Sequence, residues 1–465
     1  MAQKIRKLLV ANRSEIAIRI LRAAAELGLQ TVAIYSREDR FALHRFKADE
    51  AYLVGRGKEP LQAYLGIEEI VRVARDAGVD AIHPGYGFLS ENPDLAAACA
   101  AEGILWIGPP ADVMERLGDK VSARAVAEQA GVPVMPATGP LPDDEREVQR
   151  LAEEVGYPLM IKASWGGGGR GMRVVSDPGE LVEQVAAARR EALAAFGRDD
   201  VFLERLVERA RHLEVQILAD ESGEVVHLYE RDCTIQRRHQ KVVERAPAVA
   251  LDPEIRDQLC QAAVRLATEA GYRNAGTVEF LQDIDSGRFF FIEVNPRIQV
   301  EHTVTEVVTG VDLVKAQIRV AEGARIGTPE SGVPAQADIR LHGHAMQCRV
   351  TTEDAENELI PDYGRIITKR EATGFGIRLD GGTSHVGAVV TPYYDSLLEK
   401  ITAWAPTPEE VTARMSRALR EYRIRGVKTN LLFLNALITH PRFLAGDVTT
   451  RFIDETPEVF EFAPR

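Results

Sequence analysis

The sequence predicts an α/β protein that begins with a parallel sheet and continues into strand-rich domains. Three observations indicate this class. Over the first hundred residues, short apolar runs alternate with helical patterns, which is typical of βαβ units. From about residue 115, a helix and a Pro-rich loop lead into a small unit that contains four consecutive glycines. From about residue 206, the chain is strand-rich with interspersed helices.

The predicted elements of the first part follow one another regularly. A buried strand over 7–12 precedes a helix over 15–28, for which Ser14 is the predicted N-cap and a glycine the stop. The elements that follow are a strand over 31–36, a helix over 68–78, a strand over 80–85, a helix over 94–103 and a strand over 104–109. This order resembles a Rossmann-like half domain. Because GxGxxG is absent after the first strand, we do not expect a dinucleotide there.

The second part is predicted to be a small unit around the stretch KASWGGGGRGMR, 162–173. Its predicted elements are a connecting helix over 118–131, a Pro-rich loop over 132–144, a helix over 147–156, a strand over 157–164, a strand over 172–176, a helix over 178–197 and a strand over 201–207. The glycine run joins two strands and lacks GxxxxGK[ST], so it is not a P-loop. A run of backbone N–H groups beside Lys162 favours an anion cradle; the alternative is a floppy hairpin tip.

Composition excludes several classes of protein. The 465 residues carry a formal net charge of -13, which is unfavourable for binding nucleic acid. No apolar run is long enough for a transmembrane helix, and the N-terminal run LLVA is too short for a signal peptide. The four cysteines form no CxxC pair, so neither zinc nor disulfides are indicated. We expect a cytoplasmic protein that uses neither a membrane nor a nucleic acid.

The segment GTVEFLQDIDSGRFFFIEVN is predicted to form a hairpin that pairs two carboxylates. If its turn centres on Ser286, Glu279 faces Glu293, and Asn295 shares their face because side chains alternate along a strand. Two carboxylates about 5 Å apart repel by roughly 3 kcal/mol. A shared proton, a basic neighbour or a divalent cation must compensate, and two carboxylates with an amide oxygen suit magnesium.

The same register predicts that Leu281 faces Phe291, so the face is not simply wet. The alternative is an exposed polar face whose carboxylates pair with arginines such as Arg288 and Arg297. Beyond the hairpin, Arg297, Gln299 and Glu301 are predicted to share one face of a continuing strand. Such an arginine and carboxylate either pair structurally, or bind a small oxyanion and take its proton.

Two further segments are candidate sites. ERDCTIQRRHQKVVERAP is basic in an acidic chain, and His239 and Lys241 point the same way if it is extended. It is either a solvated face or an anion site. HPGYGFLSEN, 83–92, follows a strand at the predicted ligand-binding edge of the first sheet. It is either part of a site or a tight turn with a packed tyrosine.

Taken together, these segments resemble biotin carboxylase, a member of the ATP-grasp family. The resemblance is carried in order along nearly the whole chain by LLVANRSEIAIRI, HPGYGFLSEN, GDK, KASWGGGGRGMR, ERDCTIQRRHQKVVERAP, EFL, FIEVNPRIQVEHTVTE, CRVTTED and RIRGVKTN. Finer motifs, including LVERARH, IGTPESGVP and LDGGTSHVGAVVTPYYDSLLEK, resemble the N-terminal part of the pyruvate carboxylases. Two positions depart from the commonest family pattern: Ser14 replaces a glycine, and Arg205 stands where lysine is frequent.

The resemblance implies an ATP-grasp fold in four parts. These are an N-terminal Rossmann-like domain over 1–115, a linker helix over 116–134, a glycine-loop lid domain over 135–205, and the ATP-grasp core with a C-terminal mixed-sheet domain over 206–465. It also implies that the glycine loop is poorly ordered without nucleotide.

The resemblance also implies a set of site residues. ATP phosphates would be held by Lys120, Lys162, Gly168 and Gly169, the adenine pocket would be lined by Glu204, Arg205, Leu206, Val207 and Leu281, and the nucleotide would be contacted by His212, Gln236 and His239. Glu279, Glu293 and Asn295 would bind Mg²⁺ or Mn²⁺. Bicarbonate would be bound by Lys241, Arg297, Gln299 and Val300, Glu301 would remove its proton, Arg349 would stabilise the biotin enolate, and Tyr86 would lie near biotin.

The implied reaction is ATP- and bicarbonate-dependent carboxylation of biotin through carboxyphosphate, as the biotin carboxylase component of a pyruvate carboxylase. No AMKM-type biotinyl-lysine motif occurs, so biotin is expected on a carrier domain elsewhere, beside a carboxyltransferase. A homodimer through this domain, or a larger homo-oligomer, is expected. The alternatives are the biotin carboxylase subunit of an acyl-CoA carboxylase, another ATP-grasp carboxylate ligase, or a nucleotide-binding regulatory module without turnover.

Overall fold

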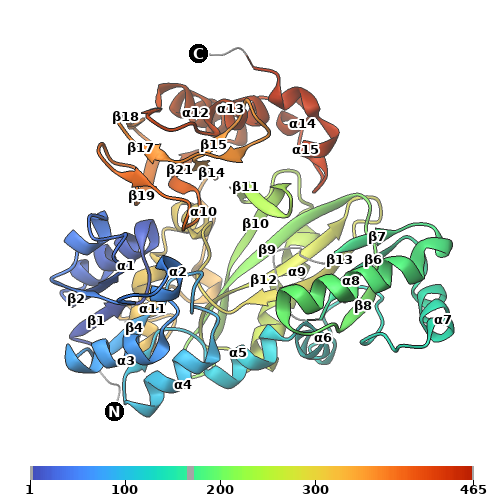
Figure 1. Cartoon of the computed structure of the whole chain (residues 1–465), viewed down its shortest axis with the longest axis horizontal. Helices are drawn as coiled ribbons and strands as arrows, with labels where there is room; N and C mark the ends of the chain where they lie inside the picture. Colours follow the sequence, from blue (N-terminus) through green and yellow to red (C-terminus); the bar gives the residue numbers. More distant parts are fainter. Residues whose placement is uncertain (1–3, 165–171, 463–465) are drawn as a thin grey trace.

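The computed structural model describes residues 4–164 and 172–462, and Figure 1 shows three regions arranged around a central sheet. The N-terminal region lies on one side, a small helix-covered sheet lies on the opposite side, and the C-terminal region lies above the space between them (Figure 1). Gly168 and Gly169, and with them the expectation about loop order, lie outside the described residues.

A five-stranded parallel sheet in the order β3-β2-β1-β4-β5 forms the N-terminal region. Its elements are β1 (Lys7–Val10), α1 (Ser14–Glu26), β2 (Gln30–Tyr35), η1 (Leu43–Phe46), β3 (Glu50–Leu53), α2 (Pro60–Ala63), α3 (Ile67–Asp76), β4 (Ala81–His83), α4 (Pro93–Ala101) and β5 (Leu105–Trp106). Alternate strand residues bury two cores: Leu8 packs with α1 on one face, and Leu9 packs with α3 and α4 on the other. The predicted order of strands and helices is confirmed, and the edge strand β3 was not predicted.

The N-cap prediction for Ser14 is wrong. Arg13 occupies the N-cap position, and no side chain caps the helix. Ser14 is the first helical residue, and its φ is +56°. Its backbone N–H donates to His44 Nδ1 at 3.4 Å, and a Cβ added to Gly382 would lie 2.0 Å from its Oγ. Tertiary contacts at the start of α1 therefore replace the local cap.

A separate three-stranded antiparallel sheet, in the order β7-β6-β8, forms the small unit. Its elements and the helices leading to it are α5 (Ala111–Gly118), α6 (Lys120–Gln129), α7 (Glu145–Val155), β6 (Leu159–Ala163), β7 (Arg173–Val175), η2 (Pro178–Glu180), α8 (Leu181–Phe196) and β8 (Val201–Arg205). Helices α7 and α8 bury its own small core, which includes Leu159, Ile161 and Val185. The predicted helices and strands around the glycine run are confirmed.

The central sheet has eight strands in the order β13-β12-β9-β10-β11-β14-β21-β19, and each neighbouring pair is antiparallel. Its strands and associated helices are β9 (Ala210–Ala219), β10 (Val225–Arg237), β11 (Gln240–Ala246), α9 (Pro253–Glu269), β12 (Asn274–Asp283), β13 (Phe289–Asn295), α10 (His302–Thr309), α11 (Leu313–Ala321), β14 (His344–Thr351), β19 (Ile377–Gly381), β21 (Leu397–Ala405), α12 (Pro408–Glu421), α13 (Leu431–Ile438) and α14 (Pro441–Leu444). The smaller elements are η3 (Gln336–Asp338), β15 (Glu353–Asp354), β16 (Ile360–Pro361), β17 (Gly364–Arg365), β18 (Thr368–Arg370), β20 (Val389–Val390), β22 (Arg423–Arg425), α15 (Phe452–Glu455) and η4 (Pro457–Phe460).

Helices pack on both faces of this sheet, and the polar residues of the strands gather on the face away from α9. Helix α9 packs on β9 and β12 through a core that includes Leu213, Val215 and Leu266. On β9, the residues between these apolar positions are His212, Glu214 and Gln216. Because neighbouring side chains on a strand point to opposite faces, these three polar residues lie on the face away from α9.

The hairpin register was predicted correctly at one pair and wrongly at the next. Glu279 pairs with Glu293, as predicted, but Leu281 pairs with Phe290 and not with Phe291. A β-bulge leaves Ile292 without a partner on β12. This extra residue lets Phe291 join the buried core while Glu293, two positions later, faces Glu279.

Candidate active site

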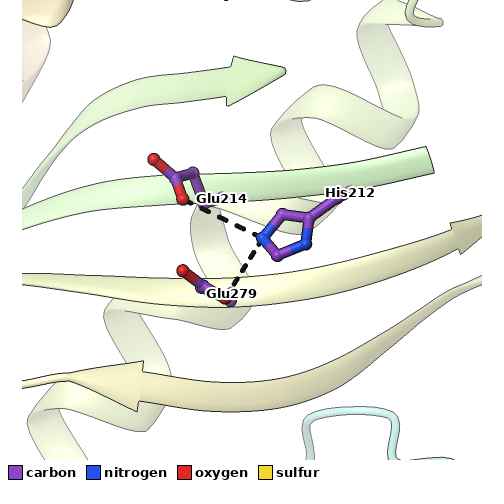
Figure 2. Close-up of side chains that lie close together, drawn as sticks. All are labelled: His212, Glu214 and Glu279. Carbon is purple, nitrogen blue, oxygen red and sulfur yellow. Dashed lines mark ion pairs between the residues drawn. The ribbon is translucent and has the colours of Figure 1, made fainter. Parts of the chain in front are cut away.

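Lys241 on β11 lies at the centre of a buried cluster of carboxylates. Its Nζ is 2.7 Å from Glu279 Oε1 and 2.7 Å from Glu301 Oε1, and it also contacts Glu214. Burial opposes the ammonium charge, but the three carboxylates outweigh burial and hold the pKa of Lys241 well above its usual value. Figure 2 shows His212 between two of these acids, with Nε2 3.1 Å from Glu279 Oε2 and 4.0 Å from Glu214 Oε2.

The facing carboxylates Glu279 and Glu293 have different surroundings. Glu279 is buried, and its Oε1 also accepts from Asn295 Nδ2 at 3.0 Å. Although burial favours the neutral acid, Lys241 and His212 hold the pKa of Glu279 well below its usual value. Burial and then the neighbouring Glu279 charge raise the pKa of Glu293. The pair therefore combines one stabilised carboxylate with one that Lys120 and Lys241 compensate only in part.

The alternative of an exposed face paired by arginines is wrong. Arg288 lies 5.1 Å from the Phe290 ring centroid, and Arg297 Nε donates to Glu91 Oε1 at 2.6 Å. The basic neighbour of the hairpin pair is Lys241 instead. Glu91 comes from the loop after β4, so a residue of the N-terminal region reaches this cluster.

Glu301 is held between two cations. It is 2 % exposed, and Arg349 Nη2 donates to its Oε2 at 3.1 Å, opposite the contact with Lys241. Burial alone would raise its pKa, but Lys241 and Arg349 hold the pKa of Glu301 far below its usual value. Arg349 is fixed in turn by Glu244, whose Oε1 accepts from Arg349 Nε at 2.6 Å. Glu301 is therefore an ionised carboxylate in a buried site.

The segment after β13 does not continue as a strand. It leaves the sheet at Pro296, and the Arg297 N–H turns back to the Asn295 carbonyl at 2.8 Å. The predicted strand face is wrong here, yet the side chains still converge. Arg297 Nη2 donates to Asn295 Oδ1 at 3.1 Å, and Gln299 Nε2 donates to Glu279 Oε1 at 3.1 Å. The Val300 carbonyl accepts from Lys400 Nζ at 3.0 Å.

The two predicted phosphate-binding lysines lie at the junction with the small sheet. Lys162 Nζ on β6 donates to Glu204 on β8. Lys120 is the first residue of α6. Burial lowers the pKa of Lys120, Glu293 raises it, and Lys162 lowers it further, so Lys120 lies within electrostatic reach of both the hairpin and β6. The lysines thus connect the small unit to the carboxylate pair.

The predicted adenine-pocket residues lie at the end of β8, directly after it, and on β12. Arg205 N–H donates to the Pro136 carbonyl, and Leu206 N–H donates to the Pro158 carbonyl, both at 2.9 Å. Val207 follows them, partly buried, and Leu281 on β12 pairs with His212 on β9. The exposed Arg205 side chain lies against Gly156 at the end of α7, where an added Cβ would lie 2.6 Å from Nη1.

The basic stretch forms the β10–β11 hairpin, and its two candidate residues separate. Gln236 pairs with Lys241 across the hairpin, and its Nε2 donates to the Cys233 carbonyl at 2.9 Å. His239 instead lies exposed in the turn, where Arg238 and His239 have φ values of +50° and +63°. The expectation that His239 and Lys241 point the same way is wrong because this turn interrupts the extended backbone.

The loop after β4 combines features of both predictions for HPGYGFLSEN. Tyr86 is partly buried against the apolar core, and its carbonyl accepts from Asn12 Nδ2 at 2.8 Å. Its ring lies 5.8 Å from Lys400 Nζ. Glu91 of the same loop binds Arg297. The loop is thus a packed turn that also contributes to the cluster.

Sequence reasoning missed three buried residues that hold the cluster together: Glu214, Arg231 and Glu244. Arg231 is fully buried; its Nε donates to Glu214 and its Nη2 donates to Gln299 Oε1 at 2.9 Å. The period-two polar pattern His212-Glu214-Gln216 within a buried strand was the available signal.

Comparison with known proteins places this geometry in a family. Three family models match in order: the biotin carboxylase N-terminal domain over 4–114, the ATP-binding domain of the carbamoyl-phosphate synthase L chain over 119–328, and the biotin carboxylase C-terminal domain over 347–455. A solved biotin carboxylase domain of the 2-oxoglutarate carboxylase from Hydrogenobacter thermophilus is 47% identical, with a TM-score of 0.94, across 99% of this chain and 100% of that one. The chain belongs to the biotin carboxylase family.

Among biotin carboxylases, pyruvate carboxylases are close relatives of this chain. The Bacillus subtilis pyruvate carboxylase is 55% identical over 99% of this chain and 40% of its own length. A structure of the Rhizobium etli pyruvate carboxylase is 62% identical, with a TM-score of 0.95, over 100% of this chain and 41% of that one. The chain thus spans about two fifths of the length of these relatives. Within the described residues, no helix is both long and apolar enough to span a membrane.

Proposed function

We propose that this chain catalyses the ATP- and bicarbonate-dependent carboxylation of biotin through carboxyphosphate, as the biotin carboxylase component of a pyruvate carboxylase. The contact that carries the proposal is that of Lys241 with both Glu279 and Glu301. The Lys241 ammonium group thereby connects two proposed functions. Glu279 belongs to the hairpin pair that suits a nucleotide-bound cation, and Glu301 is the carboxylate that would take a proton. ATP and bicarbonate would then meet within the reach of a single side chain.

The hairpin residues fit a divalent cation. Glu279, Glu293 and Asn295 offer hard oxygen ligands of the kind that Mg²⁺ and Mn²⁺ prefer. The raised pKa of Glu293, caused by burial and the Glu279 charge, supports this assignment, because added positive charge there would be stabilising. A bound cation would neutralise phosphate charge. Lys120, Lys162, Gly168 and Gly169 would bind the phosphates, and the residues of β8 with Leu281, His212, Gln236 and His239 would hold the rest of the nucleotide.

Bicarbonate would replace contacts that the cluster now makes internally. Lys241, Arg297, Gln299 and the Val300 backbone would bind the anion, and Glu301 would take its proton as the oxygen attacks the γ-phosphate. Glu301 is ionised and therefore able to accept that proton. As bicarbonate draws Lys241 away, the pKa of Glu301 would rise toward a value suited to a base.

Biotin would approach beside Glu301. Arg349 would stabilise the negative charge of the biotin enolate, and Glu244 would hold the guanidinium in place. Tyr86 would border the biotin site. Carboxyphosphate hydrolyses in water, so we propose the unit over 135–205 as a lid that closes over the nucleotide. The remaining proposed divisions of the chain are 1–115, 116–134 and 206–465.

The acceptor of the carboxyl group is proposed to be pyruvate. The support is the 55% identity to the Bacillus subtilis pyruvate carboxylase, against 47% to the biotin carboxylase domain of a 2-oxoglutarate carboxylase. The proposed partners are a biotin carrier domain and a carboxyltransferase domain. A homodimer is also proposed, because that 2-oxoglutarate carboxylase domain is described as a dimer.

The test is bicarbonate-dependent ATP cleavage with Mg²⁺, measured with and without free biotin. We expect biotin to stimulate cleavage. A folded sample that cleaves ATP only with other carboxylate acceptors would instead indicate a different ATP-grasp ligase. Nucleotide binding without any phosphate release would indicate a regulatory module.

A further inference from the structure

A cavity of about 440 Å³ lies between the central sheet and the C-terminal helices. Strands β11 and β14 form its floor, and helices α12 and α14 form its walls. Its lining residues include Arg245, Val249, Met346, Val411, Ala413 and Phe443. Small-molecule sites commonly have volumes of about 300–1,000 Å³, mostly apolar walls and a few polar groups that orient the ligand. The cavity has this size and this composition.

Arg245 is a buried charged residue of the cavity lining. The residue is 6% exposed, and its guanidinium carbon lies 4.6 Å from the Phe443 ring centroid. Among the described residues, its side chain donates one hydrogen bond, from Nη2 to Asp232 Oδ2 at 2.8 Å. A guanidinium carries five N–H donors. Arg245 therefore keeps donor capacity for a group inside the cavity.

The buried charges around Arg245 are unbalanced. Arg211 Nη2 also donates to Asp232 Oδ2, at 3.0 Å, so two guanidinium groups share one carboxylate. Arg256, which is partly buried, has its own partner in Glu230. Glu409 and Arg420 are exposed residues at the lining and have opposite charges. Among the residues that the structure describes here, one positive charge is thus left over beside the apolar walls, and a buried charge is costly unless it is paired.

This cavity is separate from the active site. Glu244 and Arg245 are neighbours on β11, so their side chains point to opposite faces of the sheet. Glu244 binds Arg349 on the active-site face, whereas Arg245 pairs in register with Met346 and lines the cavity on the other face. A ligand at Arg245 would contact the reverse side of the strands that carry Lys241 and Arg349.

We propose that this cavity binds a small amphipathic monocarboxylate. The carboxylate supplies the missing negative charge by pairing with Arg245. The apolar body packs against Met346, Val411 and Phe443. A carboxylate fits the planar guanidinium in a bidentate manner. An uncharged molecule of the same shape would fill the space between the walls but leave Arg245 and Arg211 sharing the single charge of Asp232.

The test compares 3-phenylpropionate with 3-phenylpropan-1-ol, which share an apolar body and differ in charge. Binding to the whole chain is measured by isothermal titration calorimetry and by saturation-transfer NMR. We expect the carboxylate to bind at least tenfold more tightly than the alcohol. Equal affinities, or no binding of the carboxylate at millimolar concentration, would overturn the proposal.

Two variants locate the binding. Arg245→Met should reduce the affinity for the carboxylate to that for the alcohol. Because this variant leaves Asp232 with a single arginine partner and can misfold, Ala413→Trp provides a second test: Ala413 is exposed on α12 at the cavity lining, and the indole should block both probes. The control is Arg417→Met on the same helix, outside the lining, which should bind 3-phenylpropionate normally. Undiminished binding to folded Ala413→Trp would show that the probe binds elsewhere.

Discussion

The ammonium group of Lys241 lies among three carboxylates that would otherwise repel one another in a buried site. The three carboxylates differ in their other contacts. Glu214 accepts from the fully buried Arg231, whereas Glu279 belongs to the hairpin and Glu301 contacts Arg349. Single substitutions should therefore separate metal binding, proton removal and structural support.

Replacing Glu301 with glutamine should lower turnover at least a hundredfold, since positioned acid–base groups contribute about 10²–10⁴ in rate. The amide oxygen can still accept from Lys241, so ATP affinity should change little. The measurement is biotin-dependent ATP cleavage together with equilibrium nucleotide binding. An equal loss of ATP binding would show that Glu301 has a structural role.

Glu293→Gln should raise the Mg²⁺ concentration needed for half-maximal activity at least tenfold, because it removes a charged oxygen ligand. The measurement is a Mg²⁺ titration of ATP cleavage at saturating bicarbonate. Asp285→Asn is a matched control: Asp285 is an exposed acid in the turn of the same hairpin. An unchanged Mg²⁺ requirement in Glu293→Gln would remove Glu293 from the metal site.

Residues that we propose to contact ligands were easier to predict than the residues that support them. Glu279, Glu293, Lys241 and Glu301 occur in short motifs and in a hairpin with a recognisable turn. Arg231 and Glu244 act only as counter-charges inside the fold. Their partners come from other strands, so no local spacing reveals the pairing.

At the scale of elements, the start of α6 couples helix stability to the position of Lys120. Asp119 caps this helix by accepting from the Ser122 N–H at 2.9 Å. Asp119→Ala should cost about 1 kcal/mol of stability and raise the KM for ATP, since Lys120 is the next residue. Thermal unfolding and steady-state kinetics measure the two effects.

Asp144 provides the control, because it caps α7 by accepting from the Arg146 and Glu147 N–H groups at 2.9 and 3.0 Å. Asp144→Ala should cost similar stability and leave the KM for ATP unchanged. If both variants raise the KM equally, the position of Lys120 does not depend on its cap.

Element boundaries could be predicted where local chemistry determines them and not where tertiary contacts do. The alternation of strands and helices near the N-terminus follows from periodicity alone. The bulge at Ile292 follows from competing demands on the two hairpin faces, because Phe291 joins the core while Glu293 faces Glu279. Likewise, the start of α1 depends on His44 and Gly382, which lie far from Ser14 in the sequence.

At the scale of the whole molecule, buried neutral histidines make stability depend on pH. Burial lowers the pKa of His44 from 6.5 to about 4, and burial also lowers the pKa of His227 to about 4. Below pH 6.5 the unfolded chain takes up protons that the folded chain excludes. Stability from these groups is therefore fully present above pH 6.5 and is lost as the pH falls toward 4.

For His44 alone, the loss between pH 7.5 and 5.5 should be about 1 kcal/mol. His44→Gln should reduce the pH dependence of unfolding by this amount, because glutamine does not titrate. Urea unfolding of both proteins at the two pH values measures the difference. Parallel pH profiles would show that the pKa of His44 is the same in the folded and the unfolded chain.

The continuity of the eight-stranded sheet limits how this protein can be recombined with its relatives. The C-terminal family match begins at residue 347, inside β14, and β14 pairs along its length with β11 and β21. A chimera joined at that point would take the halves of one strand from two parents. In such a chimera, Lys400 would come from one parent and the Val300 carbonyl that it contacts would come from the other. An active chimera should therefore take β11, β14 and β21 from the same parent. The segment that is exchanged must then be larger than the matched domain.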